Sequence, residues 1–223
     1  MKKIGIITAM DEEAEHIIAA YDLEEKERLG HLTFYEWENI VLVLTGIWKI
    51  QASFWTAGLI EKYGVDYLVN IWIAGNLRGN EVAIWDVFLI KEILQHDMYL
   101  PFGGEHLDYI KKPLYVNWGD EIEISWIDFW FHKGGVCATW DAFIDDKERA
   151  EELRRVTWWD VADMEAFAIA SVAREYGLED KMFTIKAVSD WADADAITAH
   201  ENNLDFAMKN SLVVLDKIVK MLM

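Results

Sequence analysis

Acidic side chains that could do chemistry follow or interrupt apolar runs at three places in the sequence: at Glu12 and Glu13, at Glu165 and at Asp190. Asp190 follows an apolar run over residues 182–188, and Glu13 follows the first apolar run of the chain. A carboxylate at the carboxyl end of an inner strand lies where α/β sheets bind small ligands. Glu165 enters an otherwise apolar helical pattern, which is unusual unless the carboxylate is paired or binds something. Together these residues predict acid/base chemistry on a neutral or cationic molecule.

Each candidate also has a purely structural interpretation. Glu12 and Glu13 could stabilise the N-terminal end of a helix through its dipole, and Asp190 could cap a helix or form a turn. Glu165 could be exposed at the start of a helix. Three further candidates are apolar and could belong to the core: Phe143, Met164 and Phe206.

The sequence contains no motif for a metal or a cofactor. Its six histidines have no ligand spacing with cysteine or with one another. A Walker loop, a G-x-G-x-x-G fingerprint and a Gly-x-Ser-x-Gly elbow are all missing. We therefore expect neither a metal nor a cofactor.

Composition excludes several classes of partner. The formal net charge of −19 disfavours nucleic acids and anionic membrane surfaces, because binding to them depends on Lys and Arg neutralising phosphates. No apolar run is long enough to span a bilayer, and the first one ends too early for a secretory signal. Cys137 has no partner for a disulfide and lies in an apolar run, so we interpret it as a small buried hydrophobe. We expect a cytoplasmic protein that acts on a small molecule.

Short apolar runs alternate with helical patterns, which predicts a layered α/β fold. We expect one domain over residues 1–223, in three layers, with a central twisted mixed β-sheet flanked by helices. Strands are predicted over residues 3–8, 40–44, 67–73, 82–94, 135–139 and 182–188. Helices are predicted over residues 11–21, 50–63, 147–154, 164–176 and 200–222. Residues 95–130 contain both prolines and are interpreted as a long loop region.

Six segments together resemble one enzyme family. They are residues 5–13 (GIITAMDEE), 45–49 (TGIWK), 74–77 (AGNL), 141–144 (DAFI), 163–166 (DMEA) and 189–190 (SD). In order and spacing they are similar to the bacterial methylthioadenosine/S-adenosylhomocysteine nucleosidases of the nucleoside phosphorylase superfamily. The resemblance implies a nucleoside phosphorylase-like fold and hydrolysis of the N-glycosidic bond between adenine and a thio-substituted ribose.

The resemblance also implies roles for individual residues. Glu13 matches the glutamate that activates water, and Asp190 matches the aspartate that protonates adenine at N7. Glu165 matches the glutamate that holds the ribose hydroxyls. Ser189 would orient Asp190 and Met164 would lie against the sugar. The remaining residues implied in substrate binding are Ala9, Ile47, Ala74, Gly75, Phe143, Ile144 and Phe206.

Hydrolysis of this N-glycosidic bond needs an acid for the base and carboxylates near the sugar. Adenine leaves poorly as an anion, so an acid with a pKa raised towards neutrality must protonate it. The sugar becomes oxocarbenium-like, and nearby carboxylates stabilise its positive charge. The motifs contain no arginine for phosphate, which favours water as the nucleophile.

Tryptophans replace glycines of the family pattern. The chain has 12 tryptophans in 223 residues, and four of them stand where the family usually has glycine: Trp48, Trp72, Trp85 and Trp140. One interpretation is natural divergence with a compensated core. Another is that the source cell reads UGA as glycine, so that these tryptophans are absent from the native protein.

Other functions stay open. The alternatives are a purine nucleoside phosphorylase, a nucleosidase for another purine nucleoside, and a nucleoside-binding protein impaired in catalysis by its tryptophans. The family forms homodimers, and we expect one here, with apolar residues around 55–59 and 98–102 at the interface.

Overall fold

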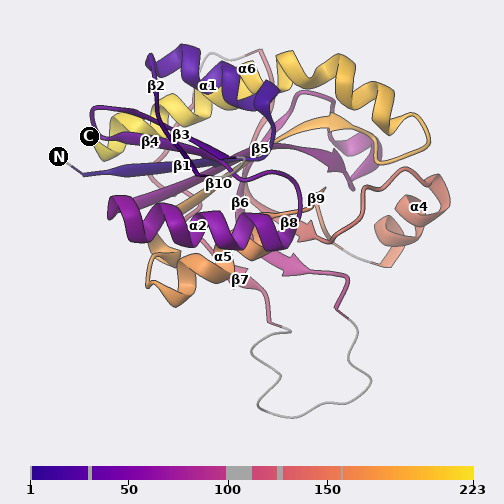
Figure 1. Cartoon of the computed structure of the whole chain (residues 1–223). Helices are drawn as coiled ribbons and strands as arrows, with labels where there is room; N and C mark the ends of the chain where they lie inside the picture. Colours follow the sequence, from indigo (N-terminus) through magenta and orange to yellow (C-terminus); the bar gives the residue numbers. More distant parts are fainter. Residues whose placement is uncertain (1, 30–31, 99–111, 125–127, 157) are drawn as a thin grey trace, which may run out of the picture.

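The computed structural model of the chain describes residues 2–29, 32–98, 112–124, 128–156 and 158–223. Its strands form one ten-stranded mixed sheet with helices packed against it (Figure 1). The predicted α/β class with a central mixed sheet flanked by helices is confirmed. The strands are β1 (Ile4–Thr8), β2 (Glu24–Leu29), β3 (Leu32–Trp37), β4 (Ile40–Leu44), β5 (Tyr67–Asn76), β6 (Val87–Gln95), β7 (Leu114–Tyr115), β8 (Phe131–Thr139), β9 (Val161–Asp163) and β10 (Met182–Asp190). The helices are α1 (Asp11–Tyr21), α2 (Lys49–Tyr63), α4 (Lys147–Val156), α5 (Ala166–Glu175) and α6 (Ala196–Leu222).

The sheet is partly closed on itself. Its strand order is β10-β6-β8-β9-β5-β1-β4-β3-β2, and β10 also pairs with β5. The pairings among β5, β10, β6, β8 and β9 therefore return to their starting strand. This closure was not predicted, because hydrophobic periodicity identifies strands but not their neighbours.

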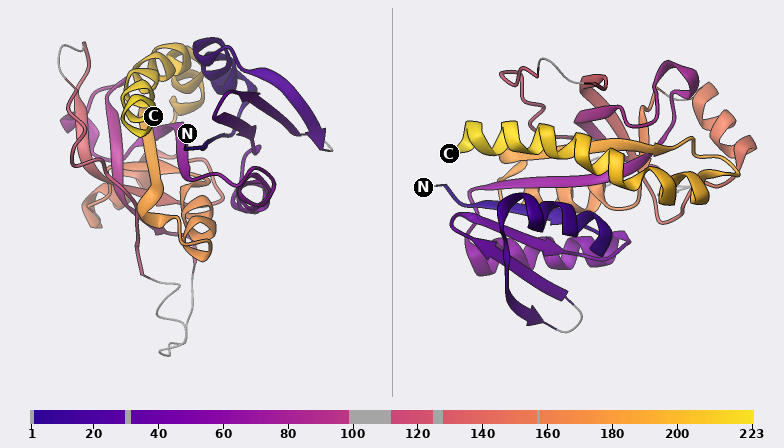
Figure 2. Two further views of the ribbon diagram at one scale, coloured as in Figure 1. Left: turned by 90° about the vertical axis from the view of Figure 1, so that its left-hand side faces the viewer. Right: turned by 90° about the horizontal axis from the view of Figure 1, so that it is seen from above.

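Helices cover both faces of the sheet. Helices α1 and α6 pack together on one face, and α2 and α5 pack together on the other (Figures 1 and 2). Each pair encloses its own apolar cluster against the strands. At Gly5 in β1, an added Cβ would lie 2.8 Å from Leu59 Cδ2, so only glycine allows α2 to approach the strand this closely.

The inner strands were predictable from the sequence because they are buried on both faces. Every residue of β1, β4 and β10 is buried, which matches the nearly continuous apolar runs of strands covered on both faces. Helix α1 begins with three acidic residues, whose charges are favourable at the N-terminal end of a helix dipole. The carboxyl ends of these strands point towards one edge of the sheet, where the site lies.

Several predicted bounds were wrong. The hairpin of β2 and β3 was missed because residues 24–29 (EEKERL) carry five charges in six positions and show no apolar alternation. Strand β6 begins at Val87 rather than residue 82, after a 3₁₀ turn over Gly79–Glu81, and helix α6 begins at Ala196 rather than residue 200. The predicted loop region contains the short strand β7, which pairs with β6, while residues 99–111 lie outside the described structure.

The expected dimer face also needs correction. Leu59 is fully buried against the sheet, and the exposed apolar side chains of α2 are instead Ile50 and Phe54. Residues 99–102 of the second expected contact region lie outside the described part of the chain. Among the described helices, none is long and apolar enough to cross a bilayer.

Candidate active site

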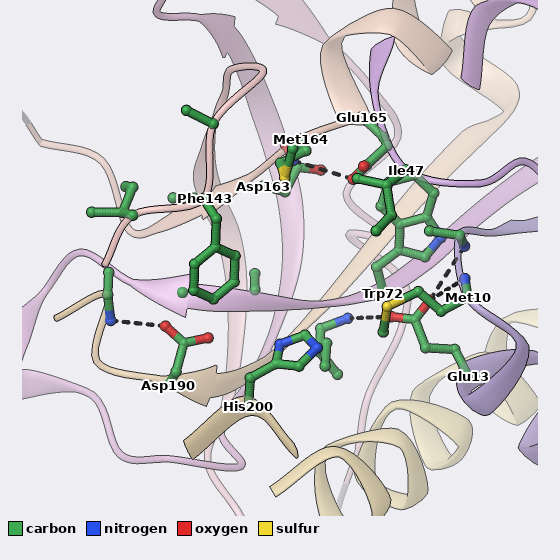
Figure 3. A pocket seen from close by; sticks show the side chains of 18 residues that line it. Met10, Glu13, Ile47, Trp72, Phe143, Asp163, Met164, Glu165, Asp190 and His200 are labelled. Carbon is green, nitrogen blue, oxygen red and sulfur yellow. Dashed lines mark hydrogen bonds between the residues drawn. The ribbon is translucent and has the colours of Figure 1, made fainter. Parts of the chain in front are cut away.

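A cavity opens at the carboxyl ends of β1, β5 and β10. Its empty space, part of which is open to solvent, amounts to about 720 Å³. Glu13, Glu165 and Asp190 all line it, from three segments far apart in the sequence (Figure 3). The other lining residues are Ala9, Met10, Ile47, Trp72, Ile73, Ala74, Gly75, Ala142, Phe143, Ile144, Ala162, Asp163, Met164, Ala192 and His200.

Glu13 lies in the first turn of α1 with its carboxylate turned back over the end of β1. Its Oε2 accepts hydrogen bonds from Thr8 Oγ1 at 2.9 Å and from the backbone N–H of Met10 at 3.1 Å and Ala9 at 3.2 Å. The backbone N–H of Ile73 donates to Oε1 at 3.3 Å. Burial raises the pKa of the Glu13 carboxyl, although these hydrogen bonds favour the charged form and oppose the rise. The result is a rigidly held, buried carboxylate.

Asp190 ends strand β10 at a break in its register. The pairing with β5 shifts between Val188 and Asp190, which places Asp190 opposite Gly75. Its Oδ2 accepts a 2.7 Å hydrogen bond from Ser189 Oγ, and its Oδ1 accepts one of 2.8 Å from the backbone N–H of Ala192. Burial raises the pKa of the Asp190 carboxyl above its usual range. A carboxyl with such a pKa can carry a proton closer to neutral pH.

Glu165 precedes helix α5 and is 4 % exposed, so the interpretation of an exposed residue at a helix start is wrong. Its Oε1 accepts a 3.0 Å hydrogen bond from the backbone N–H of Trp48, and its Oε2 accepts one of 3.2 Å from the N–H of Met164. Burial, together with the negative charge of Asp163, raises the pKa of the Glu165 carboxyl well above its usual range.

A buried ion pair lies behind Glu165. Lys186 in β10 is fully buried, and its Nζ lies 2.6 Å from Asp163 Oδ2. Asp163 also accepts hydrogen bonds from Thr139 Oγ1 and from the backbone N–H of Ala166. Burial alone would lower the pKa of Lys186, but the neighbouring carboxylates, Asp163 foremost, raise it. The lysine therefore stays charged and balances part of the negative charge beside the cavity.

The sequence predicted most of the lining but not all of its members correctly. Ala9, Ile47, Ala74, Gly75, Phe143, Ile144 and Met164 line the cavity together with the three carboxylates. Ser189 does not line it and instead donates its hydroxyl to Asp190.

Phe206 was expected near the substrate, but it is not among the lining residues. It is 55 % exposed on α6, with its ring centroid 5.2 Å from that of Trp85. His200 lines the cavity from the same helix. Six residues are about one and two-thirds turns of a helix, so Phe206 points in a different direction from His200.

Eight lining residues were not among the predicted site residues: Met10, Trp72, Ile73, Ala142, Ala162, Asp163, Ala192 and His200. His200 packs edge-on against Phe143, with ring centroids 5.9 Å apart and planes at 84°. Met10 lies inside the segment over residues 5–13 that was identified, and Trp72 lies two residues before the segment over residues 74–77, so extending each motif by two residues would have found both. His200 carried no signal beyond its place at the start of the last predicted helix.

The site is acidic and apolar. None of the lining residues in the described part of the chain is lysine or arginine. In the same described residues, no group of three or more His, Cys, Asp or Glu could hold a metal ion. The arrangement can donate a proton from one side of a bound molecule and place negative charge and a base on other sides. That suits cleavage of a bond whose leaving group needs a proton and whose other half becomes cationic.

Comparisons with known proteins agree with this geometry. The family model of the phosphorylase superfamily matches residues 3–220. A 5'-methylthioadenosine/S-adenosylhomocysteine nucleosidase of Halalkalibacterium halodurans is 30% identical over 98% of this chain and 98% of its own. The nucleosidase of the same name from Bacillus subtilis is 26% identical, with the same coverage of both chains.

A solved structure of such a nucleosidase from S. pneumoniae, with the transition-state inhibitor MT-ImmA, has a TM-score of 0.86 at 25% identity. The similarity covers 99% of this chain and 100% of that one. The chain belongs to the phosphorylase superfamily and, within it, to the family of 5'-methylthioadenosine/S-adenosylhomocysteine nucleosidases.

Proposed function

We propose that the chain hydrolyses the N-glycosidic bond of 5'-methylthioadenosine, S-adenosylhomocysteine or both, and releases adenine. The observation that carries the proposal is the meeting of Glu13, Glu165 and Asp190, all buried, in one cavity. The curated relatives are named for these two substrates, which supplies the substrate class.

Asp190 acts as the general acid. Adenine becomes a good leaving group only when N7 takes a proton as the glycosidic bond breaks. Asp190 is held by Ser189 and by the N–H of Ala192, and burial raises its pKa, so its acid form is available at higher pH than that of an exposed aspartate. The adenine ring would lie along the segment of Phe143 and Ile144, whose side chains line the same cavity.

Glu165 and Glu13 act on the sugar side. Loss of the base leaves an oxocarbenium-like ribose, which buried carboxylates stabilise. Glu165 already accepts hydrogen bonds from the backbone N–H groups of Trp48 and Met164. Its remaining lone pairs accept the ribose hydroxyls, while Met164 packs against the sugar. Glu13 accepts the proton of the attacking water, because several donors fix its carboxylate in place.

Water is favoured over phosphate as the nucleophile. A phosphorylase must bind an anion beside the ribose, and this needs basic side chains or a cluster of free N–H groups. The lining residues in the described structure include four acidic side chains and no lysine or arginine. Phosphate would therefore be repelled from the position that a neutral water can occupy.

We also propose that the protein is a cytoplasmic homodimer. Ile47, just before α2, and Ile50 and Phe54 in its first turns form an exposed apolar face next to the cavity mouth. A second copy covering this face would remove it from water.

An adenine-release assay tests the function. Purified protein is given methylthioadenosine or S-adenosylhomocysteine in buffer without phosphate, and adenine is separated by chromatography. We expect adenine with either or both substrates. Binding of methylthioadenosine without any release of adenine would instead support the nucleoside-binding alternative, and a strict need for phosphate would support the phosphorylase.

A further inference from the structure

Two tryptophans, Trp48 and Trp85, have backbone conformations that glycine adopts far more readily than any other residue. Trp48 has φ 91° and ψ 150°, and Trp85 has φ 76°. We propose that both positions are glycine in the protein as its source cell makes it, and that their codons are UGA, read there as glycine. Translation of the same gene with a genetic code in which UGA means tryptophan would give the sequence with Trp48 and Trp85.

The conformation at position 48 lies outside the left-handed helical region that other L-residues visit, at φ of about +50 to +70°. It belongs to the region of positive φ and extended ψ that is essentially confined to glycine. The backbone there is fixed on both sides of the α-carbon. The N–H of Trp48 donates to Glu165 Oε1 at 3.0 Å, and its carbonyl accepts from the N–H of Ala52 at 3.0 Å, which starts α2.

The indole of Trp48 contributes little stabilisation that could offset this strain. It is 60 % exposed at the rim of the site, so it buries little apolar surface. The N–H that holds Glu165 belongs to the backbone and would remain with glycine. The site therefore uses the backbone conformation of position 48 and makes no use of a side chain.

Position 85 also has a positive φ and a backbone fixed by hydrogen bonds, although its indole donates to Asn203 Oδ1 at 3.1 Å and packs against Phe206. The backbone N–H of Trp85 donates to the carbonyl of Val188 at 2.8 Å, and its carbonyl accepts from Asn210 Nδ2 at 2.9 Å. These bonds tie the turn before β6 to the end of β10, close to Asp190, and they hold φ positive. The Trp85 side chain is 42 % exposed. A bulky residue with φ beyond about +70° is an outlier, and in the described part of the chain the two non-glycine residues there are both tryptophan.

The other non-glycine residues with positive φ among the described ones are unlike these two. Asp22, Glu38 and Ala192 all have φ 50°, inside the ordinary left-handed region. Asp22 is also the C-cap of α1, a common place for this conformation. Within the described ranges, φ values beyond that region at non-glycine residues thus occur at tryptophans alone, and the chain contains 12 tryptophans in 223 residues.

Two buried tryptophans extend the pattern. In the described structure, the indole N–H groups of Trp72 and Trp140 are buried and have no hydrogen-bond acceptor. Buried donors are nearly always paired, so each of these indoles leaves one polar group unsatisfied. Reassigned UGA codons at these positions would account for them in the same way.

Mass spectrometry of the protein from its source cells tests the proposal directly. Digestion should yield peptides with glycine at positions 48 and 85, and the gene should carry UGA at both. Tryptophan at either position in the native peptides, or a UGG codon there, would overturn the proposal. The measurement does not depend on any activity, so its outcome is separate from that of the proposed function.

Recombinant variants test the backbone argument separately. W48G relieves the strain, whereas W48A removes the indole but keeps the Cβ that clashes at this φ. We expect W48G to raise the Tm above that of both the parent and W48A by roughly 2–8 °C. W130G is the control for loss of a largely exposed indole at ordinary φ and should not raise the Tm. A W48G variant no more stable than W48A would overturn the claim that this position is built for glycine.

Discussion

Replacing Asp190 by asparagine removes the proton that the proposed mechanism delivers to adenine and changes little else. Asparagine has nearly the same shape, and its oxygen can still accept the N–H of Ala192. Its NH₂ group can donate to Ser189 Oγ, whose own hydroxyl can turn to the carbonyl of Ala74, 3.5 Å away. No buried polar group is left without a partner, so the change acts on the chemistry and not on the fold.

The size of the effect follows from the role of the residue. A general acid contributes roughly 10²- to 10⁴-fold to a rate, which is about 3–5 kcal/mol of transition-state stabilisation. Stability should not fall, because burial disfavours the charged form of Asp190 and asparagine carries no charge. We therefore expect D190N to lose at least about 10²-fold in kcat/KM while its Tm stays at or above that of the parent.

The assay is adenine release from methylthioadenosine at saturating and limiting substrate, with thermal unfolding of the same samples. D195N is the matched control, because Asp195 lies in the same loop, is exposed and caps no helix N–H with its side chain. It should keep the activity of the parent. Adenine release by D190N within a few-fold of the parent would refute the assignment of Asp190 as the acid.

Four further outcomes follow from the same geometry. E13Q should lower kcat/KM by about 10²-fold, because an amide cannot take a proton from water; unchanged turnover would exclude Glu13 as the base. E165Q should gain stability over the parent as the pH rises from about 5 to 8, because the native state of the parent binds more protons than the unfolded state when a carboxyl pKa is raised by folding. Urea unfolding across that range checks this, and a stability difference between E165Q and the parent that does not change with pH would contradict it. S189A should move the basic limb of the kcat/KM profile to higher pH, because the Ser189 hydroxyl lowers the pKa of Asp190; an unmoved limb would argue against that coupling. F206A should keep the kcat/KM of the parent, since Phe206 does not line the cavity, and a large loss would place it in the site after all.

Local sequence pointed to Asp190 and Glu165, whereas Glu13 was chosen over Glu12 by the resemblance to the nucleosidase family. Glu13 and Asp190 follow inner strands, and both β1 and β10 pair with β5 in parallel, so their carboxyl ends meet. Glu165 was identified because a charged residue in an apolar helical segment is unusual unless it is paired or binds something. These signals depend only on residues near in sequence.

The parts that were not predicted depend on contacts between distant segments. The bond from the backbone of Trp48 to Glu165 and the register shift that places Asp190 opposite Gly75 arise from strand and helix packing. The same applies to the closure of the sheet, which no local pattern reports. Phe206 was misplaced because a motif match gives a residue's position along a helix and not the direction of its side chain.

The most direct test of the central claim is to identify the products when the reaction runs with and without inorganic phosphate. We predict free adenine and a free thio-substituted ribose, in amounts that do not change with phosphate. A sugar 1-phosphate, or turnover that requires phosphate, would contradict the account in which Glu13 directs water to a ribose whose base Asp190 has protonated.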